Sequence, residues 1–149
     1  MNRAPHLLLV EAPYYAHLAA LLREGAERAV AAAGVTCEIV SVPGAFEVPG
    51  AIALAARAAG GRFDGFVALG CVIRGETTHY DHICAETARS LQDLMVRDGL
   101  AVGYGILTVE NEAQALVRAA PDGRDKGGEA VRACLVLVEL KRRFRGNEG

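Results

Sequence analysis

The sequence has no tryptophan, and aromatic residues make up only 5% of its 149 residues. It also has no apolar run that approaches the roughly 20 residues needed to cross a bilayer. The apolar stretch at residues 7–10 stops at Glu11, too early for the apolar core of a signal peptide. These absences argue against a membrane protein and favour a protein that stays in the cytoplasm.

Paired cysteines and an excess of charge are missing as well. No C-x-x-C pair occurs among Cys37, Cys71, Cys84 and Cys134, so neither a zinc site nor a disulfide framework is indicated. The net charge of −2 gives no general attraction to nucleic acid. We interpret the only basic cluster, Lys141, Arg142, Arg143 and Arg145, as the solvated end of a helix.

What the chain does have is a high apolar content, with 52% hydrophobic residues. Its length suits one domain with a proper core and is too short for two ordinary ones, so residues 1–149 are expected to form a single domain. The prevalence of Ala, Val and Leu is typical of a compact globular protein.

Short apolar runs alternate with longer helical patterns along the whole chain. The patterns predict strands at 6–12, 37–42, 64–72 and 101–109, and helices at 18–33, 48–59, 81–98, 112–120 and about 127–144. Gly34 is expected to cap the first helix. Such alternation indicates right-handed βαβ units, and therefore an α/β fold with four parallel strands and helices on both faces of the sheet.

The last helix contains the run Ala133–Val138, which is apolar around its whole circumference. A fifth strand is the alternative interpretation, but Glu129, Ala130 and Arg132 favour a helix. One sheet covers only one side of such a helix, so we expect a neighbouring subunit to cover part of the remainder.

Polar segments follow three of the predicted strands, at residues 11–15, 43–47 and 70–82. In a parallel sheet these segments meet at the carboxyl edge, where ligands usually bind. The third segment leads into a helix, whose free N–H groups and positive dipole end suit an anion. Taken singly, its residues have ordinary explanations: His79 suits a surface position, and Thr77 and Thr78 suit helix caps.

Four segments together carry a more specific signal, namely residues 42–49 (VPGAFEVP), 68–81 (ALGCVIRGETTHYD), 105–111 (GILTVEN) and 126–130 (KGGEA). Their order and spacing closely resemble the lumazine synthase family, from about residue 7 to residue 144. The resemblance implies a flavodoxin-like three-layer αβα sandwich that assembles as a homopentamer, with active sites shared between subunits.

The resemblance also implies a reaction. 5-Amino-6-(D-ribitylamino)uracil condenses with 3,4-dihydroxy-2-butanone 4-phosphate to form 6,7-dimethyl-8-ribityllumazine, without a metal or an organic cofactor. His79 matches the family's proton-transfer histidine. Thr77 and Thr78, with the backbone N–H groups of Gly75 and Glu76, match the phosphate-binding turn. Arg118 and Lys126 match cations near the same phosphate, and the family's arginine there comes from a neighbouring subunit.

The other substrate is expected to lie beside the second and third segments. Ala45 and Glu47 match residues that hold the ribityl chain, and Val72 and Ile73 lie along the pyrimidine pocket. Tyr14 stands where the family usually has a phenylalanine that stacks on the pyrimidine ring. Tyr104 stands where an aromatic residue from the adjacent subunit closes the pocket. The expected substrate-binding set is completed by Gly44, Phe46 and Cys71.

Some positions depart from the family's pattern. Pro13 stands where arginine is frequent, and Asp125 stands where asparagine is common. Residues 121–124 lack the Gly-x-Lys-x-Gly-Asn pattern of the sixty-subunit capsids, which favours a free pentamer or a pair of pentamers. Two alternatives to the enzyme stay open: a flavin- or lumazine-binding protein without turnover, and a shell-forming protein.

Overall fold

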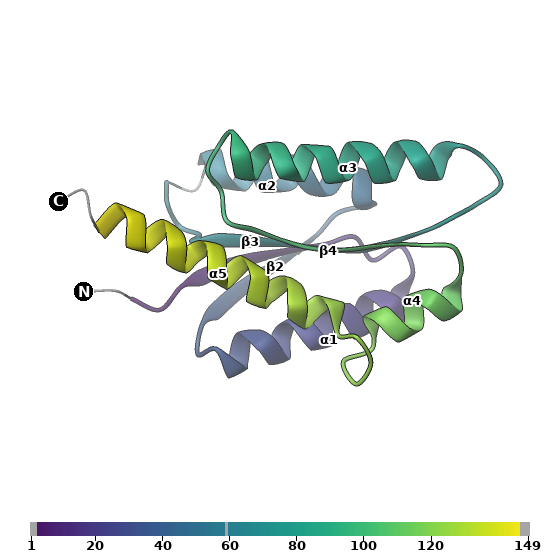
Figure 1. Cartoon of the computed structure of the whole chain (residues 1–149), viewed down its shortest axis with the longest axis horizontal. Coiled ribbons are helices and arrows are strands. Elements are labelled where there is room, and N and C mark those ends of the chain that lie inside the picture. Colours follow the sequence, from purple (N-terminus) through teal and green to yellow (C-terminus); the bar gives the residue numbers. More distant parts are fainter. Residues whose placement is uncertain (1–2, 59, 147–149) are drawn as a thin grey trace.

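Four parallel strands in the order β2-β1-β3-β4 form the middle layer of the molecule, as the computed structural model shows for residues 3–58 and 60–146 (Figure 1). The helices α2 and α3 cover one face of this sheet, and α1, α4 and α5 cover the other (Figure 1). The predicted αβα sandwich with a four-stranded parallel sheet is confirmed.

The strands are β1 (His6–Glu11), β2 (Thr36–Ser41), β3 (Gly65–Ile73) and β4 (Val102–Val109). Leu9 of β1 pairs with Ile39 on one side and with Val67 on the other. Both central strands are continuous apolar runs because both of their faces are covered by helices. Each strand lies within two residues of its predicted bounds.

The helices are α1 (Ala16–Ala32), α2 (Val48–Ala58), α3 (His79–Val96), α4 (Glu112–Ala119) and α5 (Lys126–Gly146). Their bounds also agree with the predictions within two residues, and the predicted end of α2 at position 59 lies outside the described residues. Gly34 follows the C-cap residue Ala33 with φ = +69°, so a glycine ends α1 as predicted.

Alternate residues of β1 fill two separate halves of the core. Leu7 and Leu9 pack with Val131 and Cys134 of α5 on one face. Leu8 and Val10 pack with Ile52 of α2, Leu91 of α3 and Phe66 on the other. This alternation follows from the two-residue repeat of a strand, which directs successive side chains to opposite faces.

Glycines allow α5 to lie close to its neighbours. A Cβ atom on Gly103 of β4 would collide with the carbonyl group of Ala130, and one on Gly127 would collide with the carbonyl group of Leu22 in α1. The first turns of α5 therefore rest directly on backbone. Gly127, part of the motif at 126–130, thus has a packing role.

The last segment is a helix, so the alternative of a fifth strand is wrong. Val131, Cys134 and Val138 of α5 are buried, whereas Val136 keeps 57% of its surface exposed and Phe144 keeps 62%. The apolar circumference is thus covered on one side only. Within the described residues, no helix is both long enough and apolar enough to cross a membrane.

Candidate active site

The loops after β1, β2 and β3 enclose a cavity of about 690 Å³ at the carboxyl edge of the sheet. Eleven of the predicted site residues line it: Tyr14, Gly44, Ala45, Phe46, Glu47, Cys71, Val72, Ile73, Gly75, Thr77 and His79. The residues come from three segments that are far apart in the sequence. Their convergence is the geometry expected where parallel strands end side by side.

The turn from β3 to α3 presents donors to solvent. Thr78 is the N-cap of α3, yet its side chain makes no capping hydrogen bond, and Thr77 Oγ1 accepts from the backbone N–H of His79 at 3.2 Å. His79 is the first residue of this 18-residue helix, and its side chain is exposed. An anion held at this turn would face the positive end of the α3 dipole.

Arg74 connects this turn to the first turn of α3 and to the end of β4. Its Nε donates to Glu110 Oε2 at 2.6 Å, its Nη1 lies 3.5 Å from Asp81 Oδ1, and its guanidinium lies 4.4 Å from the centre of the Tyr80 ring. The hydrogen bond with Glu110 raises the pKa of Arg74 above its usual value. Because two carboxylates already face this guanidinium, a bound phosphate needs another cation.

The loop after β2 forms a short 3-10 turn at Ala45–Glu47. Gly44 has an extended backbone, and a Cβ there would lie 3.3 Å from Glu47 Oε1. The absence of a side chain on Gly44 therefore lets the carboxylate lie close to the loop. Glu47 is exposed to the cavity and can accept hydrogen bonds from hydroxyl groups of a ligand.

Two tyrosines and a cysteine form the less polar side of the cavity. Tyr14 is 75% exposed and forms an edge-to-face pair with Tyr15 with 5.0 Å between the ring centres, so most of its ring surface is open to a ligand. Burial raises the pKa of the Cys71 thiol to about 11. Cys71 is therefore neutral near pH 7 and serves as wall, since a thiol is a poor nucleophile.

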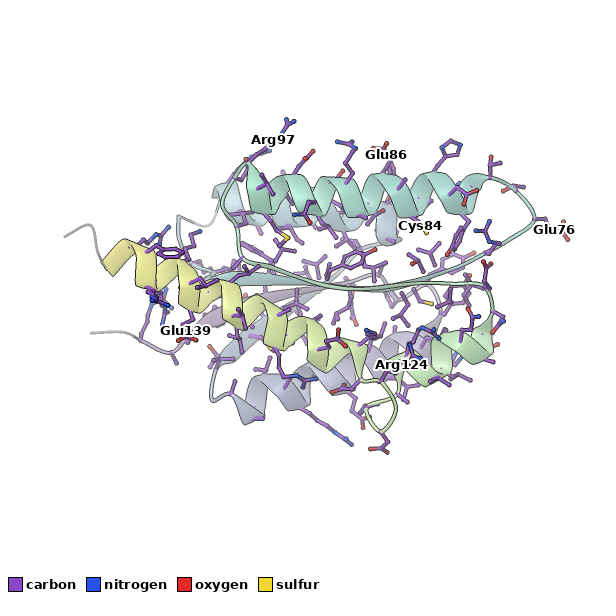
Figure 2. All side chains as sticks on the ribbon, viewed as in Figure 1. Glu76, Cys84, Glu86, Arg97, Arg124 and Glu139 are labelled. Carbon is purple, nitrogen blue, oxygen red and sulfur yellow. The ribbon has the colours of Figure 1, made fainter. Side chains whose placement is uncertain are left out.

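Five predicted residues do not line the cavity of the single chain. Glu76 stands at the tip of the turn and points outward (Figure 2), and Thr78 lies beside it. Tyr104 of β4 lines a separate groove between α3 and α5. Arg118 Nη1 donates to the Gln114 carbonyl of its own helix at 3.1 Å, and Lys126 Nζ lies 3.1 Å from Glu129 Oε2.

Sequence reasoning missed five residues of the lining: Tyr15, Pro43, Tyr80, His82 and Ile83. A signal for two of them was present, because His82 and Ile83 follow His79 at the i+3 and i+4 positions that share a helix face. The predicted helix began at residue 81, and this start hid the relationship. Across the described residues, no three His, Cys, Asp or Glu side chains are grouped to hold a metal ion.

Comparisons with known proteins agree in pointing to one family. Residues 4–142 match the sequence model of 6,7-dimethyl-8-ribityllumazine synthase. A protein of that name from Agrobacterium fabrum is 51% identical over 145 residues, covering 95% of this chain and 98% of that protein. Another from Sphingopyxis alaskensis is 55% identical over 139 residues, covering 93% and 96%. A third from Rhizobium meliloti, numbered 1, is 54% identical over 142 residues, covering 93% of each.

Proposed function

The chain belongs to the 6,7-dimethyl-8-ribityllumazine synthase family, and we propose that the cavity at the carboxyl edge of its sheet is where the reaction takes place. The protein is a transferase that condenses 5-amino-6-(D-ribitylamino)uracil with 3,4-dihydroxy-2-butanone 4-phosphate, the penultimate step of riboflavin biosynthesis. The observation that carries the assignment of the site is the convergence of eleven predicted residues on one cavity.

The cavity offers a distinct place for each part of the two substrates. The pyrimidine ring stacks on Tyr14 beside Val72 and Ile73, and the ribityl hydroxyls donate to Glu47. The phosphate of the butanone binds at the turn of Thr77 and Thr78. In this arrangement the reacting carbonyl lies near the His79 imidazole.

His79 moves protons during the reaction. Imine formation, phosphate elimination and ring closure each transfer a proton, and imidazole titrates near neutral pH. Its contribution is about 10² to 10⁴ in rate. Holding two small substrates in reacting geometry supplies several kcal/mol more, on the order of the translational entropy that a free encounter loses.

The complete site needs a second copy of the chain, and the same domain of 149 residues would form a homopentamer. Two observations support this assembly. Tyr104, Arg118 and Lys126 lie outside the cavity of their own chain. The groove of about 640 Å³ beside Tyr104 is also largely apolar, with Ala88, Leu91, Met95 and Val136 among its lining residues. A neighbour docked on that groove would receive these three side chains beside its phosphate turn.

The decisive experiment mixes the purified protein with both substrates and follows the absorbance and green fluorescence of the lumazine. We expect formation to be many times faster than the spontaneous reaction of the same substrates without protein. A rate equal to that background, with tight binding of the lumazine, would instead support the alternative of a flavin- or lumazine-binding protein without turnover. A sixty-subunit particle in native mass spectrometry would overturn the expected pentamer or pair of pentamers and would support the alternative of a shell-forming protein.

A further inference from the structure

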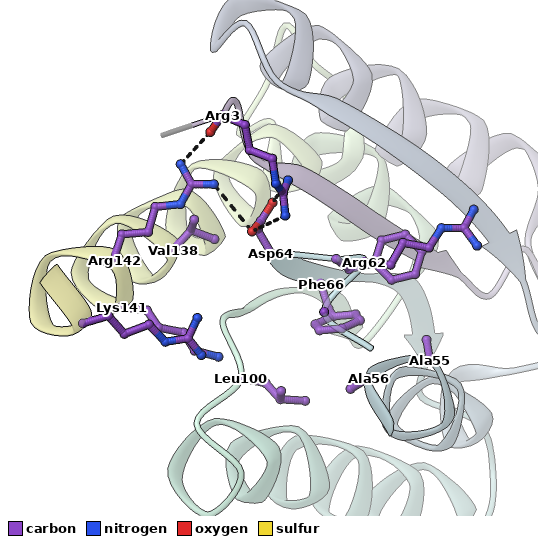
Figure 3. Close-up of a pocket in the computed structure, with 13 residues that line it drawn as sticks. Arg3, Ala55, Ala56, Arg62, Asp64, Phe66, Leu100, Val138, Lys141 and Arg142 are labelled. Atoms are coloured by element: carbon purple, nitrogen blue, oxygen red, sulfur yellow. Dashed lines mark hydrogen bonds and ion pairs between the residues drawn. The ribbon is translucent and has the colours of Figure 1, made fainter. Parts of the chain in front are cut away.

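A second cavity, of about 290 Å³, lies at the opposite edge of the sheet from the proposed active site. It opens where β3 begins, since Asp64 and Phe66 line it, and it lies between α2 and the last turns of α5 (Figure 3). None of its lining residues lines the proposed active site. The cavity therefore calls for a separate explanation.

One side of the cavity is strongly cationic. Five basic side chains line it, Arg3, Arg62, Lys141, Arg142 and Arg145, together with one carboxylate, that of Asp64. Asp64 already pairs with two of them, since Oδ2 lies 2.8 Å from Arg3 Nη1 and Oδ1 lies 3.5 Å from Arg142 Nη2 (Figure 3). Arg62 pairs with Glu38, which lies outside the cavity.

Among the described residues, two of these cations have no carboxylate partner. Within the described part of the chain, no carboxylate forms an ion pair with Lys141 or Arg145. Burial, followed by the positive charge of Arg145, lowers the pKa of the Lys141 ammonium, and the negative charge of Asp64 only partly opposes this shift. An anion bound between these two side chains would replace the lost hydration of Lys141.

The other side of the cavity is apolar. Phe66 is buried there with its ring facing Leu100 and Ala56, and Ala55 continues the wall along α2 (Figure 3). Phe63 packs edge to face on Phe66 with 5.9 Å between ring centres, which holds the Phe66 ring in place. A ligand that fills the cavity therefore needs an apolar body as well as a negative charge.

We propose that this cavity, lined by Lys141, Arg145 and the Phe66–Leu100 wall, binds a small phosphate ester that carries one aromatic ring. The phosphate accepts hydrogen bonds from Lys141 and Arg145, and the ring lies on the wall. The volume is close to the lower limit for small-molecule sites, which suits a single ring. The proposal gives Lys141 and Arg145 a role beyond that of a solvated helix end, whereas Arg143 faces a different groove.

The test is a titration of the assembled protein, carrying labelled Ala, Leu and Val methyl groups, with phenyl phosphate. Methyl NMR resolves the two cavities, since Ala56 and Leu100 report on this one and Val72 on the active site. We expect saturable shifts at Ala56 and Leu100, with phenyl phosphate binding at least about tenfold more tightly than inorganic phosphate or phenol. Equal affinity for phenyl phosphate and inorganic phosphate, or shifts confined to Val72, would overturn the proposal.

Variants separate this cavity from general surface charge. Lys141→Ala should weaken binding of phenyl phosphate about tenfold, the usual effect of losing a hydrogen bond to a charged group. Ala56→Glu should abolish it by placing a carboxylate in the cavity. Arg143→Ala removes the same charge from the same helix outside the cavity and should change affinity by less than about twofold. Equal effects of Lys141→Ala and Arg143→Ala would contradict the site.

Lumazine formation provides the folding control for these variants. Neither Lys141 nor Ala56 lines the proposed active site, so both variants should form lumazine at the rate of the unaltered protein. Retained turnover with lost binding of phenyl phosphate supports the proposal. Unchanged binding of phenyl phosphate in Ala56→Glu would refute it, whatever the fate of the proposed active site.

Discussion

The sequence places His79 next to two threonines, and the structure gives these neighbours different geometry. The Thr77 hydroxyl oxygen accepts a hydrogen bond from the backbone N–H of His79. The His79 imidazole, by contrast, lies on the first turn of α3 and lines the cavity. In the proposed site the turn binds the phosphate and His79 moves protons, so we expect loss of one function to leave the other in place.

We therefore expect His79→Ala to lower kcat by about 10² to 10⁴ while leaving turnover well above the uncatalysed rate, because positioning of the substrates survives. Steady-state kinetics with the lumazine readout measure the effect. His17→Ala is a matched control, since His17 is exposed, pairs with Glu112 and does not line the cavity. A completely inactive His79→Ala enzyme with intact assembly would show that proton transfer by His79 contributes more to the rate than positioning of the substrates does.

Asp64 contributes to the pH dependence of stability. Burial alone would raise the pKa of its carboxyl, but the His6 backbone N–H at 2.8 Å and the guanidiniums of Arg3 and Arg142 hold that pKa below its usual value. A group with a depressed folded pKa contributes stability above its unfolded pKa and loses that contribution as the pH falls through the folded pKa.

Asp64→Asn should accordingly lower the free energy of unfolding by roughly 1–2 kcal/mol near neutral pH. The difference from the unaltered protein should shrink steadily below about pH 4, where the carboxyl of the unfolded chain is protonated. Urea unfolding at a series of pH values measures it. If the difference in the free energy of unfolding grew on acidification, the ionised Asp64 carboxyl would not be the source of the stability.

At the scale of elements, the packing of α5 against β4 depends on missing side chains. We expect Gly103→Ala to destabilise the protein by about 1–3 kcal/mol, because its methyl group would press on the Ala130 carbonyl and force the helix outward. Gly50→Ala in α2 is the opposite case, since nothing lies within 4 Å of the added Cβ. That substitution should stabilise by up to about 1 kcal/mol. Thermal unfolding of both variants tests the pair, and a similar loss in both would contradict the packing argument.

The junction between β3 and α3 is held by Arg74. Replacement by methionine removes its contacts to Glu110 and Asp81, so the phosphate turn should lose its position without loss of the fold. We expect KM for the butanone phosphate to rise about tenfold, with a smaller change in kcat. Arg97→Met, at the other end of α3, is the control. An unchanged KM in Arg74→Met would show that the turn holds its shape alone.

For the whole molecule, the proposal that each site is shared between neighbouring subunits predicts complementation between two impaired chains. Arg118→Ala and His79→Ala should each be slow, but mixed rings contain sites with both native residues, one from each neighbour. Activity should therefore rise when the two variants are unfolded and reassembled together. Native mass spectrometry of the unaltered protein should show five chains or a pair of such rings. If mixing gives no gain in activity, the His79 and Arg118 of each site come from the same chain, and the proposed sharing of the site is wrong.

The sequence alone determined the order of the elements and the chemistry at the carboxyl edge of the sheet. Apolar periodicity and the glycine at position 34 report local backbone preferences, and strand ends in a parallel sheet converge whatever the details of packing. This is why the strands, the helices and most of the cavity lining could be predicted.

Only the tertiary structure decided how distant segments combine. The bracing of Arg74 by Glu110, the packing of α5 on Gly103 and the cavity around Lys141 each join residues from separate elements. No local pattern encodes such contacts, because they depend on the register of neighbouring strands and on how the helices cross the sheet. Lys141, Arg142 and Arg145 show the difference: in sequence they belong to a charged helix end, and in three dimensions they form one side of a cavity.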